Sequence, residues 1–242
     1  TLLNMKSIIE GERALCFWLS QQTEVSLNHN DQNIKQDASD MVSLMTPVVK
    51  SLFSDLGMEI TSDAMQIFGG YGYTKDQGIE QLYRDNRITP IYEGTNSVQA
   101  ADLVFRKLSN KNGKIINKFL DLIKSETDSN NEKVIPFVKE FDHYLDILKK
   151  FSEWTIERTE TSKDDVSAAA NDYLKTLGYI SLAFAWVKVL NVSFNHYEEN
   201  QKFYDDKINT AKFYFDKVLP RAEQHYKSAI SGSSNIMNFK FN

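Results

Sequence analysis

Apolar residues recur at steps of three and four along most of the chain, the spacing that places them on one face of an α-helix. Three series in the second half of the sequence are the clearest: Val134, Val138, Phe141, Leu145 and Leu148; Tyr173, Leu177, Ile180, Phe184 and Val187; and Ile208, Ala211, Phe215, Val218 and Ala222. No segment alternates apolar and polar residues over the length of a strand, so the pattern predicts an all-α fold with essentially no sheet. Because Pro220 lies inside the third series, we expect a bend there.

The distribution of polar residues and glycine divides the chain. Residues 21–36, 125–133 and 195–207 are the most polar and are expected to be connections, or a hydrophilic helix end in the first case. Five of the ten glycines lie between Gly69 and Gly94. We predict a helical domain over residues 1–110 that carries this glycine-rich segment, and a second helical domain over residues 111–242. Because Thr1 opens directly into a predicted helix, we expect the chain to be a piece of a longer protein.

Composition and charge exclude several kinds of protein. The net charge is −5 and no basic run is present, which argues against nucleic-acid binding. A single cysteine, Cys16, excludes a disulfide framework and a cysteine metal site, and we expect it to be a buried small apolar residue. The four histidines show no metal-ligand spacing. The uncharged residues 177–187 are too few to span a bilayer, and no signal segment opens the chain, so we expect a cytoplasmic location.

Residues 65–108 contain the candidate functional residues, a glycine-rich loop and a glutamate before a predicted helix. Gly69, Gly70 and Gly72 permit positive φ angles and let a ligand approach the backbone closely. The same three glycines also suit a plain helix end followed by an irregular turn. The segment is neither a dinucleotide fingerprint nor a phosphate loop, because it lacks both spacings and no strand precedes it.

Glu93 lies just before a predicted helix start, where Asn96 and Gln99 resemble a capping box. An acidic residue at this place can simply interact favourably with the helix dipole. A glutamate that follows large apolar residues such as Ile91 and Tyr92 can also act as a general base, because desolvation raises the pKa of its carboxyl group. The residues alone leave both interpretations open.

Taken in order, these elements resemble the C-terminal signature of the acyl-CoA dehydrogenases, in which Q-x-x-G-G-x-G-Y is followed by R-D-x-R-I and then by I-Y-E-G-T. The chain has Gln66, Gly69, Gly70, Gly72 and Tyr73, then RDNRI at residues 84–88, then IYEGT at residues 91–95. The sequences before and after resemble the bundle helices of this family and the extra C-terminal helical domain of its large bacterial subgroup. The family's N-terminal helical domain and middle β-domain have no counterpart among these 242 residues.

The resemblance implies the FAD-dependent α,β-dehydrogenation of an acyl-CoA thioester in fatty acid β-oxidation. Glu93 matches the catalytic base, and Gly94 matches the residue that leaves room for the thioester. The implied FAD contacts are Gln66, Ile67, Phe68, Gly69 and Gly70, in the family often supplied by the neighbouring subunit, together with Thr95, Asn96 and Ser97. Arg84, Asp85 and Arg87 are expected to form structural ion pairs. The implied partners are an electron-transfer flavoprotein as acceptor and a second copy of the chain, in a homodimer or higher oligomer.

The alternative function is a helical oligomerisation or scaffold module without chemistry of its own. Because the β-domain that holds much of the flavin in the family is missing, we expect the isolated fragment to be inactive. A helical acyl-CoA-binding protein is a third interpretation, but no basic cluster supports it. The sequence leaves open the acyl chain length and the oligomer size.

Overall fold

The computed structural model describes residues 1–109 and 113–240, and every regular element within them is helical. The all-α prediction is therefore confirmed. The elements in chain order are α1 Leu2–Asn28, α2 Gln32–Phe68, α3 Gly70–Tyr73, η1 Lys75–Gln77, α4 Ile79–Asn86, α5 Asn96–Asp102, η2 Leu103–Leu108, α6 Lys114–Thr127, α7 Ile135–Thr161, α8 Lys163–Asn195, η4 Tyr197–Glu199, α9 Gln201–Phe213, η5 Tyr214–Val218, α10 Pro220–Ala229 and α11 Ser234–Met237.

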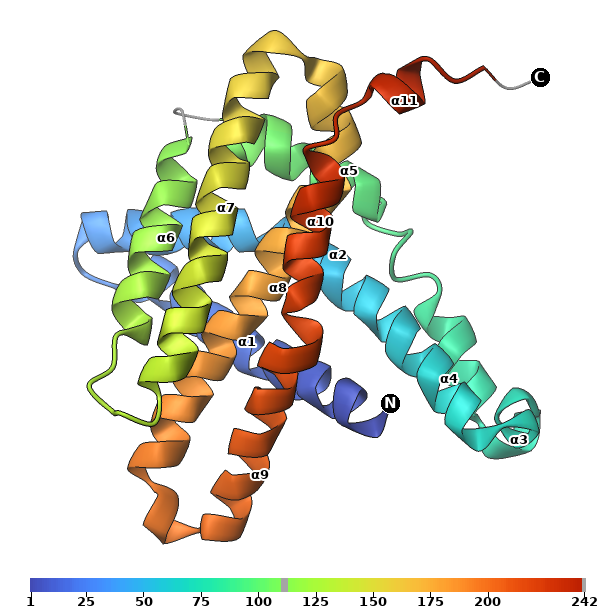
Figure 1. The fold of residues 1–242 in the computed structure, drawn as a ribbon, viewed down its shortest axis with the longest axis vertical. Coiled ribbons are helices and arrows are strands. Elements are labelled where there is room, and N and C mark those ends of the chain that lie inside the picture. The colour runs from blue at the N-terminus through green and yellow to red at the C-terminus, as the bar shows by residue number, and fades with distance from the viewer. Residues whose placement is uncertain (110–112, 241–242) are drawn as a thin grey trace.

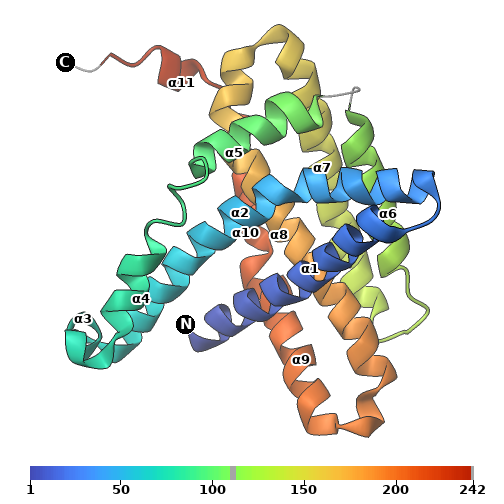
Figure 2. The ribbon, with the colours of Figure 1, turned by 180° about the vertical axis from the view of Figure 1, so that it is seen from behind.

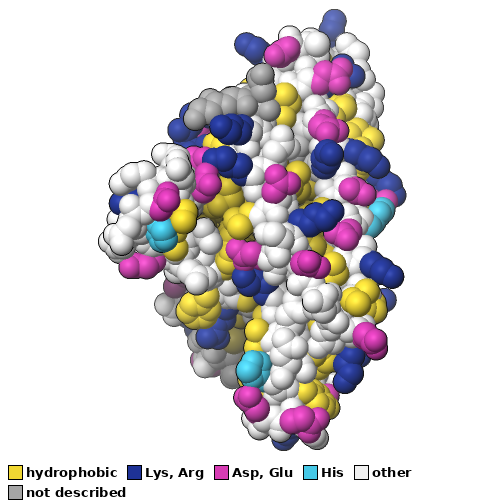
Figure 3. Space-filling view, turned by 90° about the vertical axis from the view of Figure 1, so that its left-hand side faces the viewer, with side chains coloured by type: hydrophobic (Ala, Val, Ile, Leu, Met, Phe, Trp, Pro, Cys, Tyr) yellow, Lys and Arg dark blue, Asp and Glu magenta, His cyan; other side chains and the backbone are white. Residues whose placement is uncertain are grey.

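The helices form a body from which one arm projects. Helices α6, α7, α8 and α10 run along the long axis of the body, with α9 below α10 (Figure 1). Helices α1 and α2 cross them on the other side (Figure 2). Helix α2 continues past the body, and α4 returns along it, so that residues 57–86 form an arm with α3 at its far end. On the face shown in Figure 3, charges of both signs are interspersed.

Helix α8 is the centre of the body. Nineteen of its 33 residues are buried, and it packs against α1, α2, α5, α7, α9 and α10. By length and composition α8 is apolar enough to cross a membrane, but 72% of its most apolar window is buried inside the protein. A helix that is apolar on all sides is the expected core element of such an arrangement. The apolar character of α8 is therefore accounted for by the core.

The core does not divide between the two predicted domains. Buried apolar residues from α1, α2, α7, α8 and α10 belong to one continuous cluster. Where α1 crosses α8, Gly11 lets the indole of Trp186 come so close that an added Cβ would lie 2.7 Å from its Nε1. That indole nitrogen donates to the Ser7 carbonyl at 3.1 Å. The predicted boundary at residues 110 and 111 lies outside the described residues, and the two-domain division stays a prediction.

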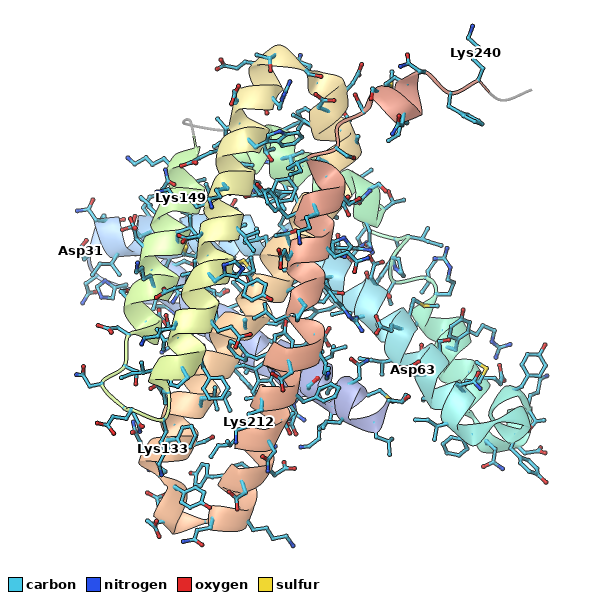
Figure 4. The ribbon with its side chains drawn as sticks, viewed as in Figure 1. Asp31, Asp63, Lys133, Lys149, Lys212 and Lys240 are labelled. Atoms are coloured by element: carbon cyan, nitrogen blue, oxygen red, sulfur yellow. The ribbon has the colours of Figure 1, made fainter. Side chains whose placement is uncertain are left out.

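Local sequence explains where the long helices begin and end. The Asp31 carboxylate caps α2 by accepting from the backbone N–H groups of Asn33 and Ile34, at the turn labelled in Figure 4. Gly69, with φ of 60°, ends this helix. Pro220 is the first residue of α10, directly after the π-helical turn η5, where its missing N–H leaves no bond unmade. The third apolar series thus spans two helices with an interruption before Pro220.

The prediction that Cys16 is buried is wrong, because the structure places it on the exposed side of α1. The buried residues Gly11, Leu15 and Trp18 follow helical spacing, and Cys16 is rotated away from this stripe by its position one residue after Leu15. Glu12 is the opposite case. Its side chain is largely buried, and its Oε1 has no hydrogen-bond partner among the described residues. Burial raises the pKa of the Glu12 carboxyl to about 8.

The buried Glu12 predicts that the stability of the chain falls as the pH rises. Its folded pKa of about 8 exceeds the unfolded value of about 4.3, so between about pH 4.5 and 8 the folded chain keeps a proton that the unfolded chain has already released. We expect Glu12→Gln to raise the free energy of unfolding at pH 7 by on the order of 2 kcal/mol, with less effect at pH 5. Urea denaturation at both pH values measures this difference. Glu24→Gln, an exposed change on the same helix, is the control. Equal gains at both pH values would contradict the prediction.

Candidate active site

The predicted site residues occupy two separate places. Gln66, Ile67 and Phe68 end α2, and Gly69 and Gly70 follow at the tip of the arm. The side chains of Ile67 and Phe68 are about half exposed, at 46% and 47%. An added Cβ at Gly69 or Gly70 would meet no atom within 4 Å, so the backbone at the tip faces open space. Labelled Asp63 in Figure 4 marks the same projecting part of α2.

Glu93 lies on the segment between α4 and α5, next to Gly94, whose carbonyl bonds to Lys50 of α2. The next helix begins at Asn96, whose side chain bonds to residues 51–55 of α2. Gly69 follows Asp55 by 14 positions on this helix, which corresponds to about 20 Å along its axis. The two halves of the predicted site are therefore separate contact regions within one chain.

The backbone at Glu93 has an unusual conformation. Its φ is 56°, and among the described residues it is the one non-glycine with a positive φ. The following Gly94 also has a positive φ, of 84°. The left-handed conformation costs a residue with a side chain about 1 kcal/mol or more, so the surrounding structure must maintain it. The Glu93 carboxylate is exposed in this chain, so the apolar enclosure considered for it is not supplied by these residues.

Both carbonyl groups of this turn accept hydrogen bonds from side chains. The Glu93 carbonyl accepts from Gln99 Nε2 at 3.0 Å, and the Gly94 carbonyl accepts from Lys50 Nζ at 2.8 Å. In contrast, the N–H groups of Glu93 and Gly94 have no acceptor within the described part of the chain. The turn thus presents a carboxylate and two free N–H donors, while hydrogen bonds to its carbonyl oxygens hold the backbone in place.

The amide of Asn96 joins the turn to α2. Its Oδ1 accepts from Lys50 Nζ at 2.9 Å, while its Nδ2 donates to Asp55 Oδ1 at 2.7 Å and to the Ser51 carbonyl at 3.1 Å. A cation on one side and a carboxylate on the other allow only one orientation of this amide. Both contacts are charge-assisted and are therefore stronger than neutral hydrogen bonds. Sequence reasoning missed Lys50 and Asp55, because nothing in their spacing points to a loop more than 40 residues later.

The predicted capping box is wrong in its details. Thr95, not Asn96, is the N-cap of α5, and its hydroxyl accepts from Val98 N–H at 3.4 Å. Gln99 donates to the Glu93 carbonyl instead of reaching the cap residue. The reason is that the Asn96 amide bonds to α2, which leaves the capping position to its neighbour.

These contacts separate the residues of the second predicted cofactor segment. The Asn96 side chain is fully engaged with α2, and its N–H donates to the Pro90 carbonyl at 3.1 Å. The Thr95 hydroxyl caps α5 by accepting from the Val98 N–H. Ser97 is exposed, and its hydroxyl has no partner among the described residues. Ser97 is thus the side chain of this segment that is free to contact a ligand.

The arginine segment meets the expectation only in part. Arg84 pairs with Glu80 within α4, at 3.8 Å, and Asp85 accepts from Gln81. Arg84, Asp85 and Arg87 are all exposed, and the described residues contain no ion pair among these three. Arg84 thus forms a structural ion pair as expected, with Glu80, whereas Asp85 and Arg87 form none within the described part of the chain.

A cavity of about 670 Å³ lies elsewhere, between α1, α8 and α9. Phe17, Trp186 and Phe203 contribute to its lining, and none of its lining residues belongs to residues 65–99. The predicted chemistry is therefore carried by an exposed loop and an exposed tip, not by this cavity.

Comparison with known proteins identifies both halves of the chain. Residues 10–108 match the family described as "Acyl-CoA dehydrogenase, C-terminal domain". Residues 114–240, more than half of the chain, match the family described as "Acetyl-CoA dehydrogenase C-terminal like". The chain belongs to the acyl-CoA dehydrogenase family. The family resemblance stated from the sequence is confirmed.

Individual relatives agree with this assignment. The chain is 35% identical over 122 residues to 3-methylmercaptopropionyl-CoA dehydrogenase of Ruegeria pomeroyi, a match that covers 50% of the chain and 21% of the relative. It is 27% identical over 228 residues to a butyryl-CoA dehydrogenase of Syntrophomonas wolfei, covering 90% and 37%. The chain thus spans well under half the length of these relatives. The structure of Caenorhabditis elegans ACDH-11 in complex with C11-CoA has the same fold, with a TM-score of 0.71 and 22% identity over 87% of this chain and 34% of that one.

We expect the hydrogen bonds of the Asn96 side-chain amide to contribute to the stability of the folded chain. Asn96→Ala leaves Lys50 and Asp55 without their charge-assisted partner, so we expect the free energy of unfolding to fall by on the order of 2 kcal/mol. Urea denaturation measures the change. Asn28→Ala is the control, because that amide donates only to Glu24 on an exposed helix end and should cost much less. Equal losses in the two variants would contradict the central position given to Asn96.

Proposed function

We propose that residues 1–242 supply the catalytic base and part of the FAD-binding surface of an acyl-CoA dehydrogenase. The observation that carries the proposal is the turn at Glu93 and Gly94, where a carboxylate and two free N–H donors share a strained backbone. Strained conformations of this kind cluster at functional sites. Membership of the family favours a catalytic Glu93 over a role in the helix dipole alone. Relatives named for butyryl-CoA and 3-methylmercaptopropionyl-CoA support an acyl-CoA thioester as substrate.

The chemistry follows from the groups on the turn. The α proton of a thioester is weakly acidic, so its removal requires both a base and stabilisation of negative charge on the carbonyl oxygen. The Glu93 carboxylate accepts the α proton, and the Glu93 N–H donates to the thioester oxygen. Gly94 has no side chain and leaves space for the thioester beside the base. FAD, when bound, supplies the acceptor for the hydride that leaves the β carbon.

The residues present fit a bound FAD in two places. At the tip of the arm, the open backbone of Gly69 and Gly70 admits close contact with a ligand, with Gln66 as a polar neighbour and Ile67 and Phe68 as apolar ones. At the start of α5, the free hydroxyl of Ser97 is available, while Thr95 and Asn96 hold the backbone that carries it. Two separate contact regions suit an extended cofactor or two copies of it.

A homodimer or higher oligomer is part of the proposal. Ten of the 22 large apolar residues that are exposed in the described chain lie between Ile67 and Val98. Exposed apolar side chains concentrated in one stretch of the chain favour an interface there. We infer that the tip of one protomer contacts the cofactor that serves Glu93 of its partner. An electron-transfer flavoprotein as acceptor and a cytoplasmic location complete the proposal by family resemblance.

The scaffold alternative applies to the chain on its own. An exposed Glu93 and an uncovered arm leave no closed pocket for a thioester, so the 242 residues without the rest of the enzyme are expected to be inactive. In that form they retain the helical core and the assembly surface.

Replacing the base tests the function directly. In the full-length gene product, loaded with flavin, we expect Glu93→Gln to slow anaerobic flavin reduction by acyl-CoA substrates by at least about 10³-fold, because an amide cannot accept the α proton. Stopped-flow absorbance on a panel of acyl-CoA chain lengths measures the rate. Glu80→Gln on α4 is the control and should reduce flavin at the parental rate. A parent protein that binds no flavin, or an equal rate in Glu93→Gln, would overturn the proposal.

Charging the tip tests the assembly. We expect Phe68→Asp to shift the full-length protein toward monomer and to lower its flavin content, because a carboxylate would be buried in the interface. Sedimentation velocity and the flavin absorbance per chain measure the two effects. Phe203→Asp on α9 is the matched control, since Phe203 is 50% exposed and Phe68 is 47% exposed. An unchanged oligomer in Phe68→Asp would contradict the placement of the interface.

A further inference from the structure

We propose that Lys50 is the positioning residue for the Glu93 base. It acts from α2 through the carbonyl of Gly94 and the amide of Asn96, at 2.8 and 2.9 Å from its Nζ. The inference rests on the function proposed above, because it assigns Lys50 a role toward the same catalytic carboxylate.

The backbone of Glu93 is strained. The positive φ of Glu93 is costly for a residue with a side chain and persists only where other contacts maintain it. The Gly94 carbonyl is the oxygen next to the base, and Lys50 is its hydrogen-bond donor. This bond holds the peptide that follows Gly94, while the Gln99 bond to the Glu93 carbonyl holds the peptide that carries the Gly94 N–H. Lys50 thereby sets the direction in which the base and its donors face.

The hydrogen-bond partners of Lys50 in the described chain all belong to the turn. Its side chain is partly buried and forms no ion pair among the described residues. Both of its hydrogen bonds go to oxygens of the segment from Gly94 to Asn96. Other lysines of the chain, such as Lys188 and Lys207, bond to carboxylates. The charge of Lys50 is therefore directed entirely at the turn.

The Asn96 amide that Lys50 contacts is itself bonded to α2 and, through Asp55, to α8. The Asn96 amide that accepts from Lys50 also donates to Asp55, and the other oxygen of Asp55 lies 3.6 Å from Lys175 Nζ on α8. The turn is thus connected to two helices of the body, and one of them belongs to the half of the chain after residue 110. Side chains held in this way keep a catalytic group within the small tolerance that catalysis requires.

Three variants test the inference in the flavin-loaded full-length protein. We expect Lys50→Met to lower the rate constant of flavin reduction by about 10- to 100-fold with KM changed less than about threefold, because the base is misdirected while substrate binding is kept. Lys50→Arg retains a cationic donor and should recover most of the rate. Lys35→Met is the matched control, since Lys35 also lies on α2 and donates to a backbone carbonyl, that of Leu27, far from the turn.

A second readout does not depend on activity. In the chain of residues 1–242, hydrogen–deuterium exchange at the backbone N–H groups of Asn96 and Gln99 reports how firmly the turn is held, because they donate to the carbonyls of Pro90 and Thr95 on either side of it. We expect at least about tenfold faster exchange in Lys50→Met and no change in Lys35→Met. Should Lys50→Met fail to fold, Lys50→Gln, a shorter neutral donor, carries the same expectations.

The outcomes separate the two proposals. Lys50→Met with the parental rate, beside an inactive Glu93→Gln, would overturn the role of Lys50 and leave the function intact. A fully active Glu93→Gln would overturn the function, and with it the catalytic meaning of Lys50, even where amide exchange is faster. Loss of rate in Lys50→Met with recovery in Lys50→Arg supports both.

Discussion

The burial of α8 is the constraint on which the rest of the structure depends. A helix that is apolar on most of its circumference must be covered from several directions, and α1, α2, α7 and α10 do so together. Because these helices come from both ends of the chain, the region after residue 110 cannot be removed without exposing the inner faces of the first two helices. The same packing places Lys175 of α8 beside Asp55 and so behind the turn that carries Glu93. The second half of the chain is thereby part of the support of the site.

The middle of α2 is packed against the body, whereas its C-terminal end is exposed. At Lys50 and Asp55, this helix holds the Glu93 turn by charge-assisted bonds. Its last turn, with Ile67 and Phe68, extends away from the body and has apolar side chains in contact with water. Burying these residues against another surface is favourable, whereas the turn at Glu93 needs no additional partner to keep its conformation. This division fits the proposed assembly, in which the tip of one chain contacts the cofactor that serves Glu93 of the other.

Much of the fold could be predicted from the sequence, since the apolar spacing identifies α7, α8 and the region of α9 and α10 and argues against a sheet. The exposed Cys16 was not predictable from composition, because a rotation of one position on α1 decides its burial. For the site, the motif names Glu93 and the glycines of the tip, but it contains no information on distance. The separation of the two regions follows from the uninterrupted helix between Asp55 and Phe68, and the bonds of Asn96 depend on a helix more than 40 residues earlier. Contacts between distant segments are set by packing, and no local pattern reports them.

The length of α2 also restricts how a complete enzyme can be assembled. An arm that places Gly69 about 20 Å beyond the residues holding the Glu93 turn cannot fold back onto its own turn without breaking the helix. In the proposed assembly, the tip therefore meets the cofactor at a neighbouring chain. A symmetric dimer provides this contact twice, since each arm reaches the partner while each Glu93 receives the partner's tip. Such an arrangement makes cofactor binding and association one equilibrium, so a change at the apolar tip alters flavin affinity without touching the catalytic turn.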